Sequence, residues 1–418
     1  MSKLFPTVPL GQIAAISMGQ SPNSSTVSEL GAAGLPFLQG NAEFGEKHPF
    51  PKYSCISPPR IGEAGSTLIS VRAPVGHTNI ADRDYCIGRG LAAVKSSQYG
   101  PVLCRSIMAQ QARALKKVSQ GTTFEAIGRD DLFSLLIPQI PLKEAEFIER
   151  ILDTLDTQIQ KTEALIVKLE KIKEGLLHDL LTRGINQNGQ LRPTPEQAPE
   201  LYRESALGLI PKEWYVSDLG ATSLSSVIGP FGSDLVASDY RSEGVPVVFV
   251  RDIASTKYNR VSDVFVDHRK AKALSAHEVK PGDLLLTKMG LPPCISAVYP
   301  DSEPAGVITA DIVRLRLKAD VAPEWAHYFV NSEAVKSQVR GITAGVTRPK
   351  VTLKDTRSLK IAVPDFEEQA RILNIIQHSS SRLESEGANL EKLKAQKSGL
   401  MGDLLTGRVR VTPLLANS

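Results

Sequence analysis

Two kinds of hydrophobic pattern alternate along the chain, and each kind occurs twice. Short apolar runs, rich in β-branched residues and interrupted by glycine and proline, predict strands before residue 140 and again within 213–363. Helices are expected among them, including 102–117 and 323–340. Each of these two regions is therefore predicted to be a mixed domain of strands and helices, which we call a head. The clearest strand-like runs are 66–71, 91–94, 245–250, 283–288 and 312–317.

After each head the apolar period becomes helical, with a heptad pattern over 141–184 and over 364–408. Pro141 and Pro364 suit helix starts, and glycines suit the stops. Each helix would have about 40 residues and a length of about 60 Å. The apolar a and d positions form a narrow seam, whose members are Ile148, Leu152, Leu155, Ile159, Ile166, Leu169, Leu176 and Leu180 in the first helix and Ile372, Ile376, Leu383, Leu390, Leu393, Leu400 and Leu404 in the second.

A narrow a/d seam requires a partner helix, and the chain supplies one in its own second half. We therefore expect the two long helices to pair as an antiparallel coiled coil. The residues alone leave two alternatives open. In the first alternative, each long helix packs only on its own head. In the second, the seam joins the helices of two copies of the chain.

An internal duplication relates the two halves of the chain. A shift of 224 residues superposes Gly121 on Gly345 and the run 179–182 on 403–406. Toward the N-terminus the offset decreases to 209, so the second copy carries insertions, which we expect in surface loops. The fold class is thus α+β with a pseudo-two-fold internal repeat. The predicted order is a first head at 1–140, a long helix at 141–184, an irregular linker at 185–212, a second head at 213–363, a second long helix at 364–408 and a tail at 409–418.

Composition places the chain among ordinary globular proteins. Its 418 residues are 42% apolar and 22% charged, which is enough for two or three cores. The four cysteines lie far apart without a C-x-x-C pair, so neither a zinc site nor a disulfide framework is indicated, and a reducing cytoplasm is the expected location. No signal peptide or membrane-spanning run is predicted. The net charge of +4 permits a nucleic-acid partner without indicating one.

Sequence signatures of catalysis are missing. The chain has no G-x-x-x-x-G-K-[ST] loop, no H-E-x-x-H pair, and no Asn-Pro-Pro-aromatic or Asp-Pro-Pro-aromatic tetrad of a base-methylating enzyme. A G-x-G-x-x-A pattern at Gly88, Gly90 and Ala93 lacks a preceding buried strand and a following acidic residue, so a dinucleotide site is not expected. We therefore predict no catalytic residue, no metal site and no cofactor bound by this chain.

Six short segments occur in a fixed order together with the two long helices: 19–22 (GQSP), 34–40 (GLPFLQG), 68–76 (LISVRAPVG), 88–91 (GRGL), 121–123 (GTT) and 207–214 (LGLIPKEW). No single segment is diagnostic. The ordered set resembles the specificity subunit of Type I restriction-modification systems over essentially the whole chain.

The resemblance implies that each head reads one half of a bipartite double-stranded DNA target and that the helices hold the heads apart. It also implies that modification subunits, expected to be two, dock on this frame and methylate adenine with S-adenosylmethionine. Restriction subunits, which use ATP and Mg, would join them for cleavage. The second head has 288–292 (KMGLP) in place of 71–74 (VRAP), so its half-site should differ.

Local charge and the resemblance together select candidate DNA contacts. Residues 105–117 carry four cations and no acid, and residues 333–360 carry seven cations against two acids. The cations expected to contact phosphate are Arg105, Arg113, Lys116, Lys117, Lys336, Arg340, Lys350 and Lys354. The residues expected to contact bases are Gln39, Asn41, Arg72, Arg89, Thr122, Thr123, Arg251, Lys288, Thr347 and Arg348.

Two other classes of function are weighed against DNA reading. A two-headed adaptor would use the coiled coil as a scaffold, and its basic stretches would merely be solvated. A nuclease would need a lysine at the required spacing after Pro364, Asp365 and the acidic pair 367–368, and none follows. The adaptor predicts no steep dependence of DNA affinity on salt, whereas a DNA reader does.

Overall fold

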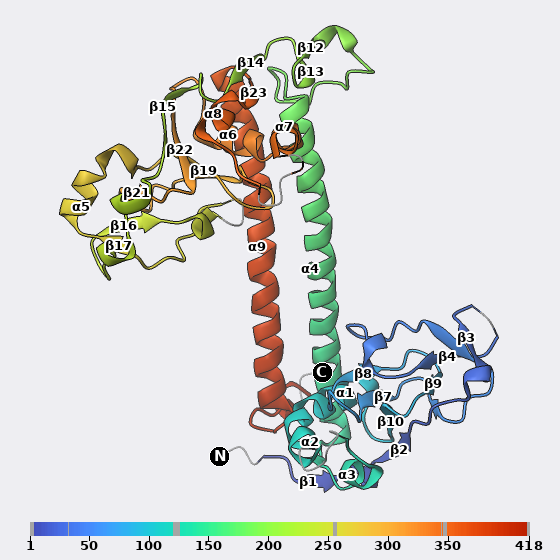
Figure 1. Cartoon of the computed structure of the whole chain (residues 1–418). Helices are drawn as coiled ribbons and strands as arrows, with labels where there is room; N and C mark the ends of the chain where they lie inside the picture. The colour runs from blue at the N-terminus through green and yellow to red at the C-terminus, as the bar shows by residue number, and fades with distance from the viewer. Residues whose placement is uncertain are drawn as a thin grey trace. The chain divides into compact units, whose positions relative to one another are not determined.

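The computed structural model describes residues 4–31, 33–119, 126–253, 257–343, 345 and 349–415 (Figure 1). Four of the expected base-contacting residues, Thr122, Thr123, Thr347 and Arg348, lie outside the described residues. The chain divides into two compact units. Unit 1 consists of Met1–Ile166 with Glu386–Ser418, and unit 2 is Val167–Ser385. Each unit thus contains one head and a segment of each long helix.

The head of unit 1 contains two sheets. The four-stranded sheet has the order β2 (Ala14–Met18), β10 (Leu91–Ser96), β7 (Thr67–Ser70), β8 (Thr78–Ile80). The five-stranded sheet has the order β3 (Val27–Glu29), β5 (Tyr53–Cys55), β4 (Leu35–Leu38), β9 (Tyr85–Ile87), β6 (Ile61–Gly62), and its β4 and β9 run parallel. A separate pair, β1 (Thr7–Pro9) and β11 (Leu136–Pro138), closes the head. The strands predicted at 66–71 and 91–94 are therefore present.

One predicted helix of this head is two helices. α1 (Pro101–Gln110) and α2 (Ala112–Ser119) take the place of the helix expected over 102–117, and α3 (Arg129–Phe133) follows. The Gln111 amide donates to the carbonyls of both Ile107 and Met108, a tightened turn that ends α1. The change of direction allows Leu115 of α2 to join the same core as Leu103 of α1. Tertiary packing has overridden a continuous helical pattern.

The head of unit 2 repeats this topology. Its first sheet has the order β15 (Ser223–Ile228), β22 (Ile312–Leu317), β19 (Leu284–Thr287), β20 (Ser296–Val298). Its second sheet has the order β17 (Phe265–Val266), β16 (Val245–Val248), β21 (Gly306–Ile308), β18 (Glu278–Val279), with β16 parallel to β21. The pair β14 (Tyr215–Asp218) and β23 (Lys360–Val363) matches β1 and β11. The duplication seen in the sequence is a duplication of strand order.

The helices of this head also follow the first copy. They are α5 (His268–Ala273), α6 (Pro323–Val330), α7 (Glu333–Thr343) and α8 (Leu353–Ser358). The helix expected over 323–340 is thus again split, at Asn331 and Ser332. Trp325 and Phe329 of α6 are buried in the same core as Val335 and Val339 of α7.

The proline and glycine content of the linker between the first long helix and the second head predicts an irregular segment. This prediction is wrong for part of the linker. It contains a β-hairpin of β12 (Tyr202–Ser205) and β13 (Gly208–Pro211). Gly208 adopts a φ of +85°, which favours glycine, and Ser205 Oγ donates to the Gly208 carbonyl over 2.7 Å. Tyr202 and Ile210 are buried, so the hairpin has its own apolar anchors.

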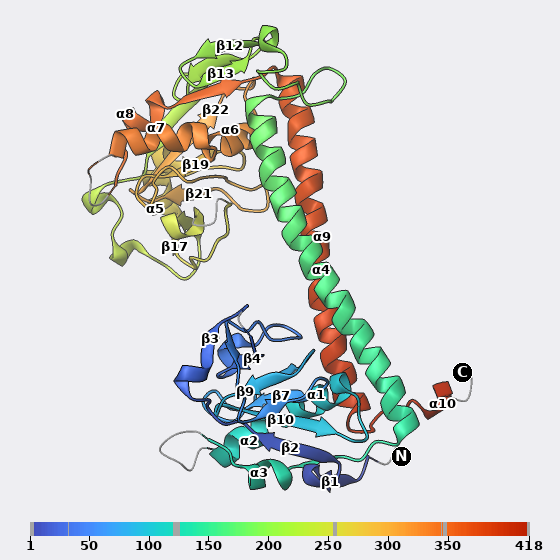
Figure 2. The same ribbon diagram turned by 90° about the vertical axis from the view of Figure 1, so that its right-hand side faces the viewer.

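The two long helices are α4 (Leu142–Thr182) and α9 (Phe366–Leu404), and within each unit their segments lie side by side (Figures 1 and 2). In unit 1, Asp156 pairs with Lys397 and Glu163 with Lys394. In unit 2, Leu180 shares a core with Ile372 and other residues of α9. Residue numbers rise along one helix as they fall along the other, so the pairing is antiparallel. The predicted α+β class with paired long helices is confirmed.

The seam differs in burial along its length. Its fully buried members are Ile148, Leu152, Ile159, Leu180, Ile372, Ile376 and Leu404. Its half-buried members are Leu155, Ile166, Leu169, Leu176, Leu383, Leu390, Leu393 and Leu400. Most of the buried members belong to the core of a head. Where one helix packs only on the other, the narrow seam between them stays partly open to water.

Candidate nucleic-acid interface

The first head presents Gln39 and Arg89 at one edge of its five-stranded sheet. The two residues follow β4 and β9, which run parallel, so both strands end at this edge. The Gly88 amide donates to the Leu38 carbonyl over 2.8 Å and holds the two segments together. A β-carbon at Gly88 would lie 3.0 Å from the Gln39 carbonyl oxygen, so glycine allows this close approach. Both Gln39 and Arg89 are exposed on a backbone that hydrogen bonds hold in place.

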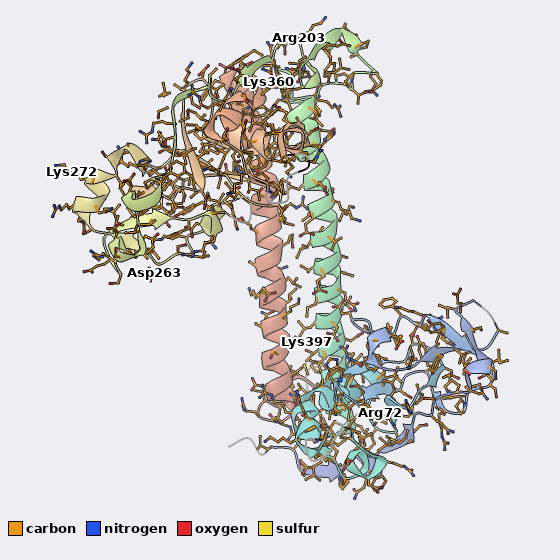
Figure 3. All side chains as sticks on the ribbon, in the orientation of Figure 1. Arg72, Arg203, Asp263, Lys272, Lys360 and Lys397 are labelled. Atoms are coloured by element: carbon orange, nitrogen blue, oxygen red, sulfur yellow. The ribbon has the colours of Figure 1, made fainter. Side chains whose placement is uncertain are left out.

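Arg72 and Asn41 lie close to the same edge. The Val71 amide donates to the Gly90 carbonyl over 2.9 Å, so the exposed Arg72, labelled in Figure 3, follows directly after a contact with the Arg89 loop. Asn41 Nδ2 lies 3.3 Å from Nδ1 of His77. The structure thus brings together the four base-contact candidates of the first head that it describes.

His77 was not among the predicted contacts. Its amide donates to Ser70 Oγ over 2.9 Å, which fixes the turn between β7 and β8 beside Asn41. The sequence contains no spacing that identifies His77, because its neighbour Asn41 is 36 residues away. Only the folded chain shows that an imidazole lies beside this edge.

The second head forms the same edge with different side chains. The Thr309 amide donates to the Val248 carbonyl over 3.0 Å, and the Lys288 amide donates to the Asp311 carbonyl over 2.8 Å. These bonds match those made by Gly88 and Val71 in the first head. Arg251 follows β16 as Asn41 follows β4, so Arg251 and Lys288 both lie close to this edge.

The arginines of the first edge have no counterpart in the second. Arg72 and Met289 occupy equivalent isolated β-bridges, with Ala126 and Lys350 respectively. Ala310 takes the place of the arginine that follows β9. The two edges therefore present different chemical groups on one backbone frame, as expected if they read different sequences.

Aromatic rings hold the two cations of the second edge. The Arg251 guanidinium carbon lies 4.4 Å from the centroid of the Phe249 ring, and Lys288 Nζ lies 4.7 Å from that of Phe231. Such contacts restrain long side chains while leaving their charge available. Arg251 Nε also donates to Ser262 Oγ over 2.6 Å. Neither aromatic residue was predicted, although Phe231 aligns with the 19–22 segment of the first head.

Each head has an open hollow beside its edge. The first has a volume of about 490 Å³ and is lined by Ser21, Phe37, Gln39 and Tyr53 among others. The second has a volume of about 390 Å³, and its lining includes Phe249, Arg251 and Asp311. Both hollows lie where the parallel strands end, so each is accessible from the surface that carries the candidate contacts.

The basic stretch of the first head divides into two parts. Arg105 donates from Nη2 to Asp156 of α4 over 2.7 Å and from Nη1 to the Glu46 carbonyl over 3.0 Å. Its side chain is only 12% exposed, so these contacts give Arg105 a structural role within unit 1. The other three candidates, Arg113, Lys116 and Lys117, are exposed on α2.

The basic candidates of the second head are more scattered. Arg340 of α7 is paired with Glu333 of the same helix, and Lys336 is half-buried. Lys350 and Lys354 are exposed before and within α8. Lys350 lies nearest the second edge, because it forms the bridge with Met289.

The described residues contain no cluster of His, Cys, Asp and Glu that could hold a metal ion.

A buried strand, β9, does precede Gly88, contrary to expectation. It is followed by strand β10 rather than by a helix, so the helix N-terminus that a dinucleotide fingerprint requires is not formed there. Among the described helices, none combines the length and apolar character needed to span a bilayer.

Comparison with known proteins is consistent in both sequence and structure. The family model described as Type I restriction modification DNA specificity domain matches residues 3–171 and 255–395, about three quarters of the chain. The "Putative type I restriction enzyme MjaX specificity subunit" of Methanocaldococcus jannaschii is 38% identical over 169 residues, which are 40% of this chain and 40% of that protein. The type I restriction enzyme MjaVIII specificity subunit of the same organism is 23% identical over 72% of this chain and 68% of its own length.

A solved structure extends the likeness to the fold. The S subunit of a Type I restriction-modification system from M. genitalium superposes with a TM-score of 0.58 and covers 96% of each chain. The two sequences are 14% identical, so this likeness concerns the fold alone.

Proposed function

Since the chain belongs to the family of Type I restriction-modification DNA specificity domains, we propose that it is the DNA-reading subunit of such a complex, with each head recognising one half of a bipartite target. The observation that carries the proposal is the pair of equivalent edges. Arginine suits bidentate contact with guanine, and glutamine suits adenine, so Gln39, Arg72 and Arg89 form a reading set for the major groove.

The second edge supports a separate half-site. Arg251 and Lys288 are the cations there, and neither stands at a position equivalent to an arginine of the first edge. The exposed cations Lys116 and Lys117 in one head, and Lys350 and Lys354 in the other, would contact phosphate and set the position of each head on the duplex. Thr122, Thr123, Thr347 and Arg348 remain proposed base contacts.

The paired helices are proposed to set the separation of the two half-sites. The long helices would act as a ruler and as the docking frame for modification subunits. Their seam is half-buried over much of its length, and several further apolar residues of α4 are exposed, including Val167 (52%) and Ile172 (49%). Such side chains suit contact with another protein.

Catalysis is proposed to reside on the partners. Modification subunits, expected to be two, would supply S-adenosylmethionine and methylate adenine, and restriction subunits would supply ATP and Mg for cleavage. The purified chain alone should therefore transfer no methyl group to DNA, and should support transfer only together with its modification subunit. Methylation by the chain alone would contradict this division of labour. The cytoplasm is the proposed location.

Target selection tests the central proposal. The chain assembled with its modification subunit is incubated with random double-stranded DNA, and bound sequences are recovered. Two short blocks separated by an unread gap of constant length are expected, and a single continuous block would overturn the proposal. A reader that makes about six phosphate contacts should also lose roughly a thousandfold in affinity between 50 and 200 mM salt, whereas an adaptor should show no such dependence.

An insertion tests the ruler separately. Four helix-forming residues inserted into both long helices at the boundary of the two units, after Ile166 in α4 and after Ser385 in α9, would lengthen the pair by about 6 Å, which corresponds to nearly two base pairs. The selected gap should lengthen by one or two base pairs while both blocks stay unchanged. An unchanged gap in a library of spacer lengths would exclude the helices as the element that sets the spacing.

A further inference from the structure

The second edge carries exposed apolar side chains where the first carries an arginine. The loop after β19 has Met289, Gly290 and Leu291 in the region that Arg72 occupies in the first head. Leu291 is 87% exposed, and Phe231 is 57% exposed. Apolar side chains this exposed gain free energy only when a partner covers them.

The backbone shows that the two loops are equivalent. The Val351 amide donates to the Lys288 carbonyl over 3.0 Å, and the Ile127 amide donates to the Val71 carbonyl over 2.9 Å. At the point where each loop leaves its sheet, an equivalent backbone hydrogen bond therefore joins the loop to the segment before β23 in the second head and before β11 in the first. The heads differ in the chemistry of the loop and in one additional glycine, not in its attachment.

The surroundings of the apolar loop are those of a DNA-facing surface. Lys288 lies over the Phe231 ring, and the exposed Lys350 forms the bridge with Met289. Cations beside exposed apolar side chains suit a surface where phosphates lie next to base edges. Asp311 brings one half-buried carboxylate near this surface, and its backbone carbonyl is bonded to Lys288.

We propose that the second head reads the C5 methyl group of a thymine through Leu291. The base edges of the major groove present one apolar group, which is this methyl, so an apolar reading contact there selects thymine. The first head, with Arg72 at the equivalent position, reads its half-site by polar contact. This inference rests on the proposed function, because it assigns a base feature to a surface that is itself proposed to read DNA.

Removal of the methyl group tests the inference. With the target known from selection and the chain assembled with its modification subunit, each thymine of both half-sites is replaced in turn by deoxyuridine. At one position in one half-site the affinity should fall about fourfold, the effect of one buried methyl. In the Leu291→Ala variant the same replacement should have no effect. All other replacements should leave affinity unchanged in both proteins.

A matched variant controls for the loss of any exposed leucine. Leu224 of β15 belongs to the same unit and is 69% exposed, so Leu224→Ala should retain the full response to deoxyuridine. Thermal unfolding of both variants should match that of the parent chain, because both side chains face water.

Three outcomes overturn the inference. The first is that no thymine responds to loss of its methyl. The second is that the response persists in Leu291→Ala. The third is that Leu291→Ala weakens thymine and deoxyuridine targets equally, which would instead indicate a side chain wedged between base steps. If the assembled complex selects no defined sequence, the proposed function itself has failed, and the two failures are thereby distinguished.

Discussion

Unit 1 and unit 2 follow one plan but hold the head against the long helices in different ways. In unit 1, Asp156 of α4 pairs with Arg105 of the head and with Lys397 of α9, the last of which is labelled in Figure 3. The corresponding positions in unit 2 are occupied by Ser380 on α9 and His327 on α6, so no such ion pair forms there. The head contact in unit 1 is electrostatic, whereas His327 lies close to Ser296 and Asn331 inside its own head.

Unit 2 relies on a buried carboxylate at the start of α9. Glu368 accepts two hydrogen bonds from Arg192, of 2.5 and 2.9 Å, and one of 3.1 Å from Nε1 of Trp214. The side chains of Glu368 and Arg192 are 2% and 8% exposed. These contacts bind the linker, the head and the helix to one another.

The first copy has an open version of the same cluster. Glu144, at the start of α4, accepts both hydrogen bonds from Arg410, and the Arg410 guanidinium carbon lies 4.6 Å from the Phe5 ring centroid. Arg410 is 36% exposed, so water reaches it even when Glu144 is bound. Each copy thus pairs the carboxylate at the start of its long helix with an arginine, but the burial of the pair differs. Burial decides how much the loss of one partner costs.

The largest effect is expected from Glu368→Ala. The substitution leaves the Arg192 guanidinium buried with only Glu213 to pair with, and it removes the acceptor of Trp214 Nε1. A buried charge that loses its principal partner costs about 3–5 kcal/mol. Both tryptophans of the chain, Trp214 and Trp325, lie in unit 2, so urea unfolding followed by tryptophan fluorescence reports the loss directly.

The matched substitution in unit 1 is Glu144→Ala. Because Arg410 is partly hydrated, the expected cost is about 1–2 kcal/mol, and the tryptophan transition should stay in place. Equal costs in the two units would show that burial does not distinguish the two clusters. Hydrogen exchange in α4 measures the effect in unit 1.

The next largest effect is expected from Asp156→Ala. It removes the shared partner of Arg105 and Lys397, whose side chains are 12% and 21% exposed, and should cost unit 1 about 2–3 kcal/mol. Faster hydrogen exchange in α1 and in the facing part of α9 is the measurement. The corresponding change in unit 2, Ser380→Ala, should shift stability by less than about 0.5 kcal/mol. A similar loss from both substitutions would contradict the comparison.

A smaller, pH-dependent effect is expected from His327. Burial lowers its pKa from 6.5 to about 4, so the folded unit keeps the imidazole neutral. As the pH falls below 6.5 the unfolded chain takes up the proton first, and the stability of unit 2 should decrease by about 1–2 kcal/mol by pH 5. Tryptophan-monitored unfolding at pH 7 and pH 5 measures this, and His327→Gln should remove that part of the change. If His327→Gln lost as much stability between pH 7 and pH 5 as the parent chain, the pH dependence would not come from His327.

The smallest effect is expected from Lys394→Ala. Its ion pair with Glu163 has a distance of 2.8 Å, but the two side chains are 45% and 32% exposed. The hydrogen bond from Lys394 lowers the pKa of Glu163, yet water and salt screen such exposed pairs, so the expected loss of stability is the smallest of the series. Hydrogen exchange at low and at high salt should show no more than a marginal difference. If Lys394→Ala destabilised unit 1 as much as Asp156→Ala does, solvent exposure would not determine how much an ion pair contributes to stability.

Much of the architecture was predictable because it follows from local patterns. Alternation and β-branched residues predicted the strands at 66–71 and 312–317, and heptads predicted α4 and α9. The predictions failed where packing between distant segments overrides such patterns. The helix expected over 102–117 is interrupted at Gln111 so that Leu115 reaches the core, and the linker expected to be irregular contains a hairpin anchored by Tyr202.

The candidate site shows the same division. Gln39, Arg72 and Arg89 are of residue types that contact bases, and they lie in the segments that carry the family resemblance. Their convergence depends on parallel pairing of β4 with β9, which no short-range pattern encodes. Arg105 was a candidate phosphate contact by charge alone, but its ion pair with Asp156 spans 51 residues of sequence.

Residue type and period therefore sufficed for the duplication, the class of fold and the two long helices, whereas the family was reached through the resemblance of six short segments in a fixed order. Three features required the folded chain: His77 beside Asn41, the aromatic rings under Arg251 and Lys288, and the exposure of Leu291. The physical reason is the range of the forces involved. Backbone propensity and amphipathic period act over a few neighbouring residues, whereas contact and exposure depend on which distant segments exclude water from one another.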